Sequence, residues 1–238
     1  MNDQELLIQY YQKTADDYEI VHLHENDEHL TACKLICSLC SEVEVNSILD
    51  TGCGTGRNIA YLNSYFSQAK VMGNDVSPDL LNIATEKHKI PSDELVCCSS
   101  YELPFADNSF DIVTEFAMLH HVAEPERVVA EMLRVARKAI FISDSNRFAQ
   151  GSLSSRLTKL FLYKTGLWWP LRQLANGGKR WNYSEGDGVY YSYSVFDSLK
   201  LVETSCTKVF TIPTTAAPGA AISPLLFAPH VLLCGLKS

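Results

Sequence analysis

The chain has 238 residues, 46% of them hydrophobic, with 28 Asp and Glu against 20 Lys and Arg and a formal net charge of −8. A chain of this length buries enough apolar surface to fold without disulfides, and its acidic balance disfavours nucleic acid as an obligate partner. The first residues, MNDQELLIQYYQK, do not resemble a secretory signal, so we expect a cytoplasmic protein whose eight cysteines stay reduced.

Helical periodicity over 3–20 and 28–43 predicts two helices before the first strand. The second carries three cysteines at i, i+4 and i+7, and this spacing predicts the buried stripe of a helix. The alternative is a metal site, made by Cys33, Cys37 and Cys40 with His22, His24 or His29. We prefer the buried stripe and assign no metal.

Strands and helices then alternate. Strands are predicted at 46–50, 70–75, 94–98, 109–116 and 138–143, with helices near 57–67, 78–88 and 125–137 between them. Strands this apolar indicate a parallel sheet covered by helices on both faces. Two last strands, 207–212 and 230–236, are expected to return to the same sheet. The sequence therefore predicts an α/β fold with a Rossmann-like, doubly wound, mostly parallel seven-stranded sheet.

The stretch SILDTGCGTGRNIAYL places Gly52, Gly54 and Gly56 directly after a predicted strand, where bare backbone lets a ligand approach closely. A nicotinamide fingerprint requires glycine at position 57, which is Arg57, and a P-loop requires G-K-[ST], which does not follow. Asp75 ends the next predicted strand, where a carboxylate can accept hydrogen bonds from both hydroxyls of a ribose. The alternative for Asp75 is a cap or turn residue of the following helix.

Five stretches together resemble a known family. They are YYQKTADDYE, ILDTGCGTG, GNDVSPDLL, ELPFADNSFDIVTEFAMLHHV and EMLRVARKAIFI. They are similar to the class I S-adenosylmethionine-dependent methyltransferases, especially the small-molecule branch that includes ubiquinone and menaquinone biosynthesis methyltransferases. The resemblance covers about residues 10–142.

The resemblance implies S-adenosylmethionine as cofactor and S-adenosylhomocysteine as product. By this resemblance, Asp50 is expected to anchor the glycine loop, Asp75 to hold the ribose and Val76 to contact the adenine. Ser99 departs from the family pattern, because an acidic residue often stands there and a serine lacks charge assistance. The implied cofactor site comprises Tyr11, Tyr18, Asp50, Gly52, Cys53, Gly54, Gly56, Asp75, Val76, Ser99, Ser100 and Phe116.

Methyl transfer is an in-line displacement, so the protein mainly positions the acceptor, and a neutral histidine can act as base where the acceptor carries a proton. His120 and His121 follow the fourth strand, and the resemblance favours His120 as the residue nearer the acceptor; a helix-edge or capping role is the alternative. Asp144 and Asn146 follow the fifth strand, where they either orient the acceptor or cap a turn.

Residues 146–200 form a predicted insertion that holds 11 of the 24 aromatic residues and eight Lys and Arg against three Asp and Glu. Its aromatic, partly cationic character suits an apolar, aromatic or anionic small molecule, with Trp168 and Trp169 as acceptor contacts. A helix over 152–164 carries Leu153, Leu157, Leu160 and Phe161 on one face and Arg156 and Lys159 away from it. Such a helix either packs on the domain as a lid or contacts a membrane surface.

We therefore expect one methyltransferase domain over 1–238: lid helices in 1–45, a cofactor-binding core in 46–145, the substrate-lid insertion in 146–200 and the final strands in 201–238. The apolar stretch 216–236 is not expected to span a membrane, because it contains three prolines. Two alternatives are an inactive cofactor-binding regulatory partner and a protein or RNA methyltransferase. The sequence predicts neither the methylated atom nor the oligomeric state.

Overall fold

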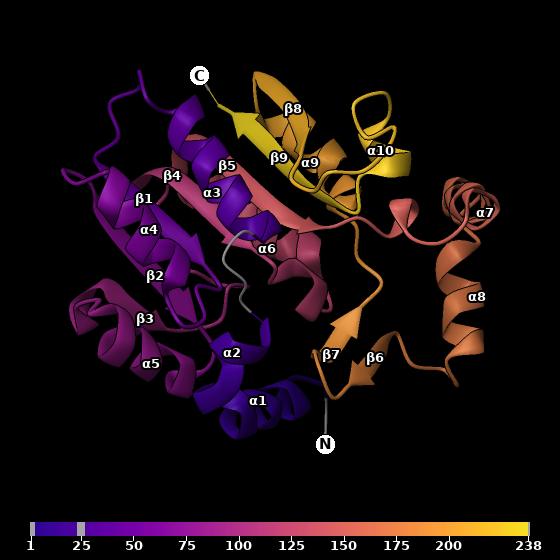
Figure 1. Ribbon diagram of the computed structural model, residues 1–238, viewed down its shortest axis with the longest axis horizontal. Coiled ribbons are helices and arrows are strands. Elements are labelled where there is room, and N and C mark those ends of the chain that lie inside the picture. The colour runs from indigo at the N-terminus through magenta and orange to yellow at the C-terminus, as the bar shows by residue number, and fades with distance from the viewer. Residues whose placement is uncertain (1–2, 23–26, 238) are drawn as a thin grey trace.

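The computed structural model describes residues 3–22 and 27–237. Its centre is a seven-stranded sheet in the order β3-β2-β1-β4-β5-β9-β8 (Figure 1). The strands are β1 (Ser47–Thr51), β2 (Lys70–Asp75), β3 (Leu95–Cys97), β4 (Phe110–Phe116), β5 (Ala136–Ser145), β8 (Lys208–Pro213) and β9 (His230–Leu236). Neighbours pair in parallel except β9, which runs antiparallel to both β5 and β8. The predicted fold is confirmed.

Helices cover both faces of the sheet. One face is covered by α3 (Glu28–Leu39), α4 (Arg57–Tyr65) and α5 (Pro78–His88), and the other by α6 (Pro125–Val135) and α9 (Leu199–Ser205). Every residue of β4, FDIVTEF, is buried, as expected for a central strand that is covered on both sides.

The cysteine stripe of α3 is buried in the core, as predicted. Cys33, Cys37 and Cys40 are at most 6% exposed. Among the described residues, the groups of three or more potential metal ligands that lie close together contain no cysteine. His24, which the alternative invoked, lies outside the described residues.

Several element boundaries differ from the prediction. The helix predicted over 3–20 is divided into α1 (Asp3–Thr14), a 3-10 turn and α2 (Tyr18–His22). The helix predicted to reach 137 ends at Val135, because Ala136 already pairs with Phe110 and the Arg137 guanidinium donates to the buried Asp111 carboxylate. Side-chain contacts between distant strands therefore fix this boundary.

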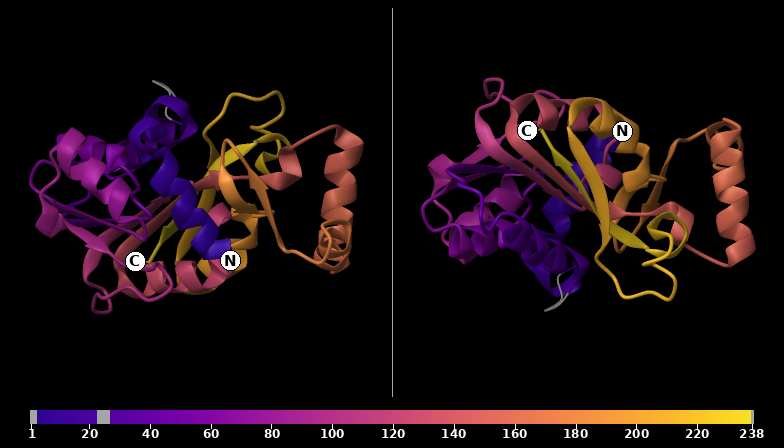
Figure 2. Two further views of the ribbon diagram at one scale, coloured as in Figure 1. Left: turned by 90° about the horizontal axis from the view of Figure 1, so that it is seen from below. Right: turned by 90° about the horizontal axis from the view of Figure 1, so that it is seen from above.

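The insertion contains α7 (Leu153–Lys164), α8 (Trp168–Ala175) and a hairpin of β6 (Trp181–Ser184) and β7 (Gly188–Tyr191). The hairpin lies against α1, and the Tyr10 and Tyr183 rings meet edge to face at 6.4 Å. Helices α7 and α8 project from the body of the molecule (Figure 2). A short helix, α10 (Pro224–Phe227), precedes β9.

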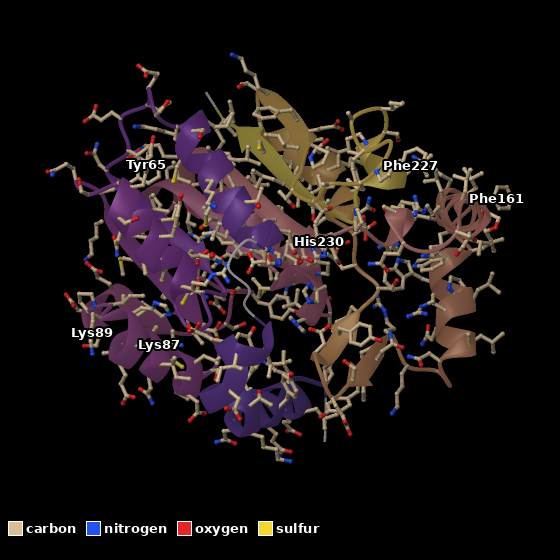
Figure 3. The ribbon with its side chains drawn as sticks, in the orientation of Figure 1. Tyr65, Lys87, Lys89, Phe161, Phe227 and His230 are labelled. Carbon is tan, nitrogen blue, oxygen red and sulfur yellow. The ribbon has the colours of Figure 1, made fainter. Side chains whose placement is uncertain are left out.

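Helix α7 packs on the domain through its basic face, whereas a lid helix would pack through its apolar stripe. The stripe of Leu153, Leu157 and Phe161 is 53%, 49% and 64% exposed, and Phe161 lies at the outer edge of the molecule (Figure 3). The basic side chains face inward instead. Arg156 donates to the carbonyls of Gly151 and Leu226, and Lys159 to those of Arg147 and Gln150. These carbonyls attract the cations. Of the two alternatives given for this helix, packing on the domain through the apolar stripe is therefore wrong.

Candidate cofactor and acceptor site

The glycine loop between β1 and α4 leaves space beside its backbone. Gly54 has φ +52°, and a Cβ at this position would meet nothing within 4 Å. Gly56 has a different role from the predicted one, because a Cβ there would stand 2.4 Å from the Ile90 side chain. Gly56 thus lets α4 and α5 approach each other, whereas Gly54 faces a cavity.

Asp75 lies at the end of β2 and supports this loop. Its carboxylate accepts hydrogen bonds from the backbone N–H groups of Gly54, at 2.9 Å, and Ser77, at 2.8 Å. Burial raises the pKa of the Asp75 carboxyl. The N-cap of α5 is Ser77, whose hydroxyl accepts from Leu80 N–H, so Asp75 does not cap the helix. The turn part of the alternative does describe Asp75, because its carboxylate accepts from the N–H two residues on.

Two cavities meet at the loop. The smaller, about 230 Å³, gathers six of the predicted cofactor residues, namely Tyr11, Gly52, Asp75, Val76, Ser99 and Ser100. The larger, about 630 Å³, is lined by Tyr18, Cys53, Gly54, Phe116 and His120 and by residues of the insertion. Gly52, His121 and Tyr191 line both cavities, so the two cavities adjoin at these residues.

Asp50 lies beneath the loop and is 1% exposed. One carboxylate oxygen accepts from the Thr114 hydroxyl at 2.9 Å, and the other has no partner among the described residues. Burial raises the pKa of Asp50 to about 7. Its side chain therefore bonds to β4 rather than to the loop that it was expected to anchor.

His120 and Asp144 form a buried pair at the inner wall of the larger cavity. His120 Nδ1 lies 2.8 Å from Asp144 Oδ1, and the His120 backbone N–H donates to Asp144 Oδ2. Burial opposes the charge on His120, but the Asp144 carboxylate and, farther away, Asp187 raise the pKa of His120 to about 10. His120 therefore carries a proton at neutral pH, unlike the neutral histidine expected of a base.

His121 connects the core to the hairpin. Its Nδ1 donates to the Val189 carbonyl at 2.6 Å, and burial together with the charge of His120 lowers the pKa of His121 to about 4. Its Nε2 lies 3.7 Å from the Asp187 carboxylate. His121 is thus a neutral ring that holds the hairpin over the junction of the two cavities.

Of the four residues predicted to contact the acceptor, only some line the larger cavity. Trp168 lines the larger cavity, whereas Trp169 does not and stacks near Arg180. Asp144 is fully buried and reaches the cavity only through His120. Asn146 is also fully buried, and its amide donates to three carbonyls in residues 224–228 while its oxygen accepts from Phe148 N–H and the Ser194 hydroxyl. The turn-stabilising alternative therefore describes Asn146.

Sequence reasoning missed three residues that line the larger cavity from other segments. Glu28 lies in the first turn of α3, Asp187 occupies the hairpin turn and His230 begins β9, whereas His29 was named only as an alternative metal ligand with the cysteines. His230 was not predictable, because it reaches the cavity only through the antiparallel direction of β9, which begins where the carboxyl ends of the parallel strands lie. In register, His230 pairs with Ser145 at the end of β5.

Comparison with known proteins agrees with this geometry. Residues 49–142 match the family model described as a methyltransferase domain. Phosphatidylethanolamine N-methyltransferase of Cereibacter sphaeroides is 35% identical over 128 residues, 51% of this chain and 62% of that protein. Ubiquinone/menaquinone biosynthesis C-methyltransferase of Desulfotalea psychrophila is 33% identical over 90 residues, 38% of this chain and 37% of that protein. The chain thus spans less than two thirds of the length of these relatives.

The fold comparison extends over the whole chain. Magnesium protoporphyrin IX methyltransferase of Synechocystis, solved with bound S-adenosylmethionine, superposes with a TM-score of 0.64 over 100% of this chain and 98% of that chain, at 13% identity. Residues 49–142 thus carry the match to a methyltransferase domain, and the whole chain shares the fold of this S-adenosylmethionine-binding methyltransferase. In the part of the chain that the structure describes, every helix is too short or too polar to cross a membrane.

Proposed function

We propose that this chain transfers the methyl group of S-adenosylmethionine to a small-molecule acceptor that carries an anionic or ionisable group. The observation that carries the proposal is the junction of the two cavities at Gly52 and His121, with the His120–Asp144 pair facing the larger one. Bound S-adenosylmethionine would supply an electrophilic methyl group on a sulfonium.

The smaller cavity fits the nucleoside part of the cofactor. Asp75 keeps lone pairs for ribose hydroxyls while it holds the loop, and Val76 and Ser99 offer an apolar contact and a hydroxyl for adenine. The open space at Gly54 lies in the larger cavity, next to Gly52, where the methionine part of the cofactor would lie. Tyr11 and Tyr18, which contact each other edge to face at 6.0 Å, cover the two cavities from the N-terminal helices.

The larger cavity suits an acceptor with an apolar body and an anionic group. Phe116, Trp168 and Tyr193 supply the apolar wall, and the protonated His120 supplies a donor and a positive charge. We infer that His120 binds and orients the anionic atom, with Asp144 as the positioning residue behind it. Relatives that act on phosphatidylethanolamine or on quinones, and a structural neighbour that acts on a magnesium porphyrin, support a large apolar acceptor.

We also propose that α7 contacts a membrane surface from which such an acceptor is taken. The outward stripe of Leu153, Leu157 and Phe161 and the exposed leucines of α8 support this proposal. The insertion is also the most basic part of the chain, which suits an anionic lipid surface.

Asp75→Asn tests the cofactor assignment. We expect weaker binding of S-adenosylmethionine by about 1–3 kcal/mol, because the charge-assisted bonds to ribose are lost while one oxygen still accepts from the loop. Calorimetry measures the affinity, and Asp93→Asn, which removes an exposed carboxylate outside both cavities, is the matched control. Equal affinity in both variants would contradict the ribose assignment.

Incubating the chain with a metabolite extract and radiolabelled methyl donor tests the transfer itself. A labelled small molecule that depends on His120 is the expected result. Cofactor binding without any labelled product would favour the inactive regulatory partner, and label in protein or RNA would favour a macromolecular acceptor.

A further inference from the structure

A second group of polar side chains lines the larger cavity, on elements that the His120–Asp144 pair does not use. Glu28 and His29 occupy the first turn of α3, and His230 is the first residue of β9. Figure 3 shows His230 near the centre of the molecule, beside the N-terminal end of α3. Two imidazoles and one carboxylate that converge on a cavity are a ligand set for a divalent transition metal.

The distances suit such an ion. His230 Nε2 lies 3.3 Å and His29 Nε2 3.9 Å from Glu28 Oε1, and the three residues each offer a ligand atom within 4.8 Å of the others. Atoms that bind one Zn²⁺ at about 2.0–2.2 Å in a tetrahedron lie roughly 3.3–3.6 Å apart. Small side-chain rotations therefore bring all three ligand atoms to one ion.

The surroundings hold the ligands in place. His29 Nδ1 hydrogen-bonds to the buried Ser143 hydroxyl at 3.2 Å, which turns Nε2 toward Glu28. Asp27 caps α3 by accepting from the N–H groups of His29 and Leu30, and Arg57 clamps Asp27 through two bonds of 2.6 and 2.7 Å. His230 Nε2 already lies 3.3 Å from Glu28 Oε1, whereas its buried Nδ1 has no partner among the described residues.

The cavity offers a competing group, His120, His121 and Asp187. There the carboxylate is 43% exposed on the turn of the hairpin, and His120 is already engaged by Asp144. The ligands from α3 and β9 are attached to elements of the core instead, so they are better preorganised for an ion.

We propose that Glu28, His29 and His230 bind one divalent transition-metal ion, whose open position faces the acceptor cavity and takes an oxygen, nitrogen or sulfur atom of the acceptor. The binding of the acceptor to this ion rests on the proposed methyl transfer. The two proposals are linked by place, since Glu28, His29 and His230 line the same cavity as Gly52 and Gly54. Three protein ligands with one open position are typical of zinc sites that bind substrate.

Titration of the chelator-treated chain with Co²⁺ tests the site, followed by the visible absorption of the bound ion and by competition with Zn²⁺. We expect one Co²⁺ per chain, with affinity at least 100-fold weaker in Glu28→Gln and in His230→Gln. Ser143→Ala is expected to weaken it about 10-fold, because the orientation of His29 is lost. Asp187→Asn is the matched control and is expected to keep the wild-type affinity.

Equal Co²⁺ affinity in the wild type, Glu28→Gln and His230→Gln would overturn the site, and so would loss of binding in Asp187→Asn alone. Thermal unfolding of each variant shows that it is folded. Calorimetry with S-adenosylmethionine on the metal-depleted chain separates the two proposals. Absence of cofactor binding there counts against methyl transfer, whereas the Co²⁺ titration reports on the metal site in either case.

Discussion

At the scale of single residues, Gly54 is a position where an added methyl group is expected to affect cofactor binding far more than folding. Its φ of +52° strains any other residue, but a Cβ would meet open space. We expect Gly54→Ala to lower the free energy of unfolding by about 1–2 kcal/mol through this strain and to abolish detectable binding of S-adenosylmethionine, because the methyl group enters the cavity.

Gly177→Ala is the control for Gly54→Ala, since Gly177 has φ +60° and equally open surroundings outside both cavities. Denaturant unfolding and calorimetry on both variants measure the two effects. A Gly54→Ala variant that binds the cofactor like Gly177→Ala would show that the loop does not enclose it.

The His120–Asp144 pair predicts an alkaline limit of activity. Because the protonated His120 binds the acceptor in our proposal, activity is present below its pKa and is lost as pH rises through about 10. Asp144→Asn removes the charge that raises this pKa, so the loss is expected to move down to about pH 6.5 or below. The pH profile of kcat/KM measures this shift, with Asp93→Asn as control.

An alternative outcome would assign His120 the opposite role. If His120 acts as a base, Asp144→Asn moves an acid limb downward and leaves the alkaline side unchanged. The limb that moves, alkaline or acid, therefore separates a protonated His120 that binds the acceptor from a His120 that acts as a base.

Single residues show where sequence reasoning succeeds and where it stops. Asp75, Val76 and Ser99 were predictable as neighbours, because loops at the ends of adjacent parallel strands must meet. The protonation of His120 was not, since it depends on an Asp144 contact across 24 residues. Asn146 is of a residue type that could bind the acceptor, but its side-chain amide donates to backbone carbonyls of a segment about 80 residues away.

At the scale of elements, α7 shows that an amphipathic pattern predicts a helix without predicting which face is buried. The carbonyls of Arg147 and Gln150 bind Lys159, and this contact turns the apolar stripe outward. By contrast, the bounds of the parallel strands were predictable to within two residues. A run as apolar as FDIVTEF is expected only in a strand that is buried on both faces.

The exposed stripe of α7 predicts binding to lipid vesicles. Replacing Leu157 and Phe161 together by Ser removes two side chains that would insert, a loss of about 3 kcal/mol or more and on the order of 100-fold in partitioning. Cosedimentation with vesicles of phosphatidylcholine and phosphatidylglycerol measures it. Ile222→Ser is the control, because Ile222 is 88% exposed outside α7 and α8. The membrane proposal fails if the double variant sediments like the control.

At the scale of the whole molecule, the site draws on segments from both ends of the chain. The first turn of α3 and the start of β9 meet in one cavity because the sheet order places β9 beside β5. The alternation of strands and helices was enough to predict the doubly wound sheet. It did not predict the antiparallel direction of β9, which brings His230 to the carboxyl ends of the parallel strands.

The hairpin of β6 and β7 connects the core of the molecule to its N-terminal helix. The same hairpin that His121 holds through Val189 also reaches α1, because the Tyr191 hydroxyl donates to the Asp3 carboxylate. Tyr191 lines both cavities, and α1 closes the smaller one through Asp3 and Leu7. The hairpin therefore joins the wall of the larger cavity to the helix that covers the smaller one, so that loss of either contact is expected to loosen the cover of both.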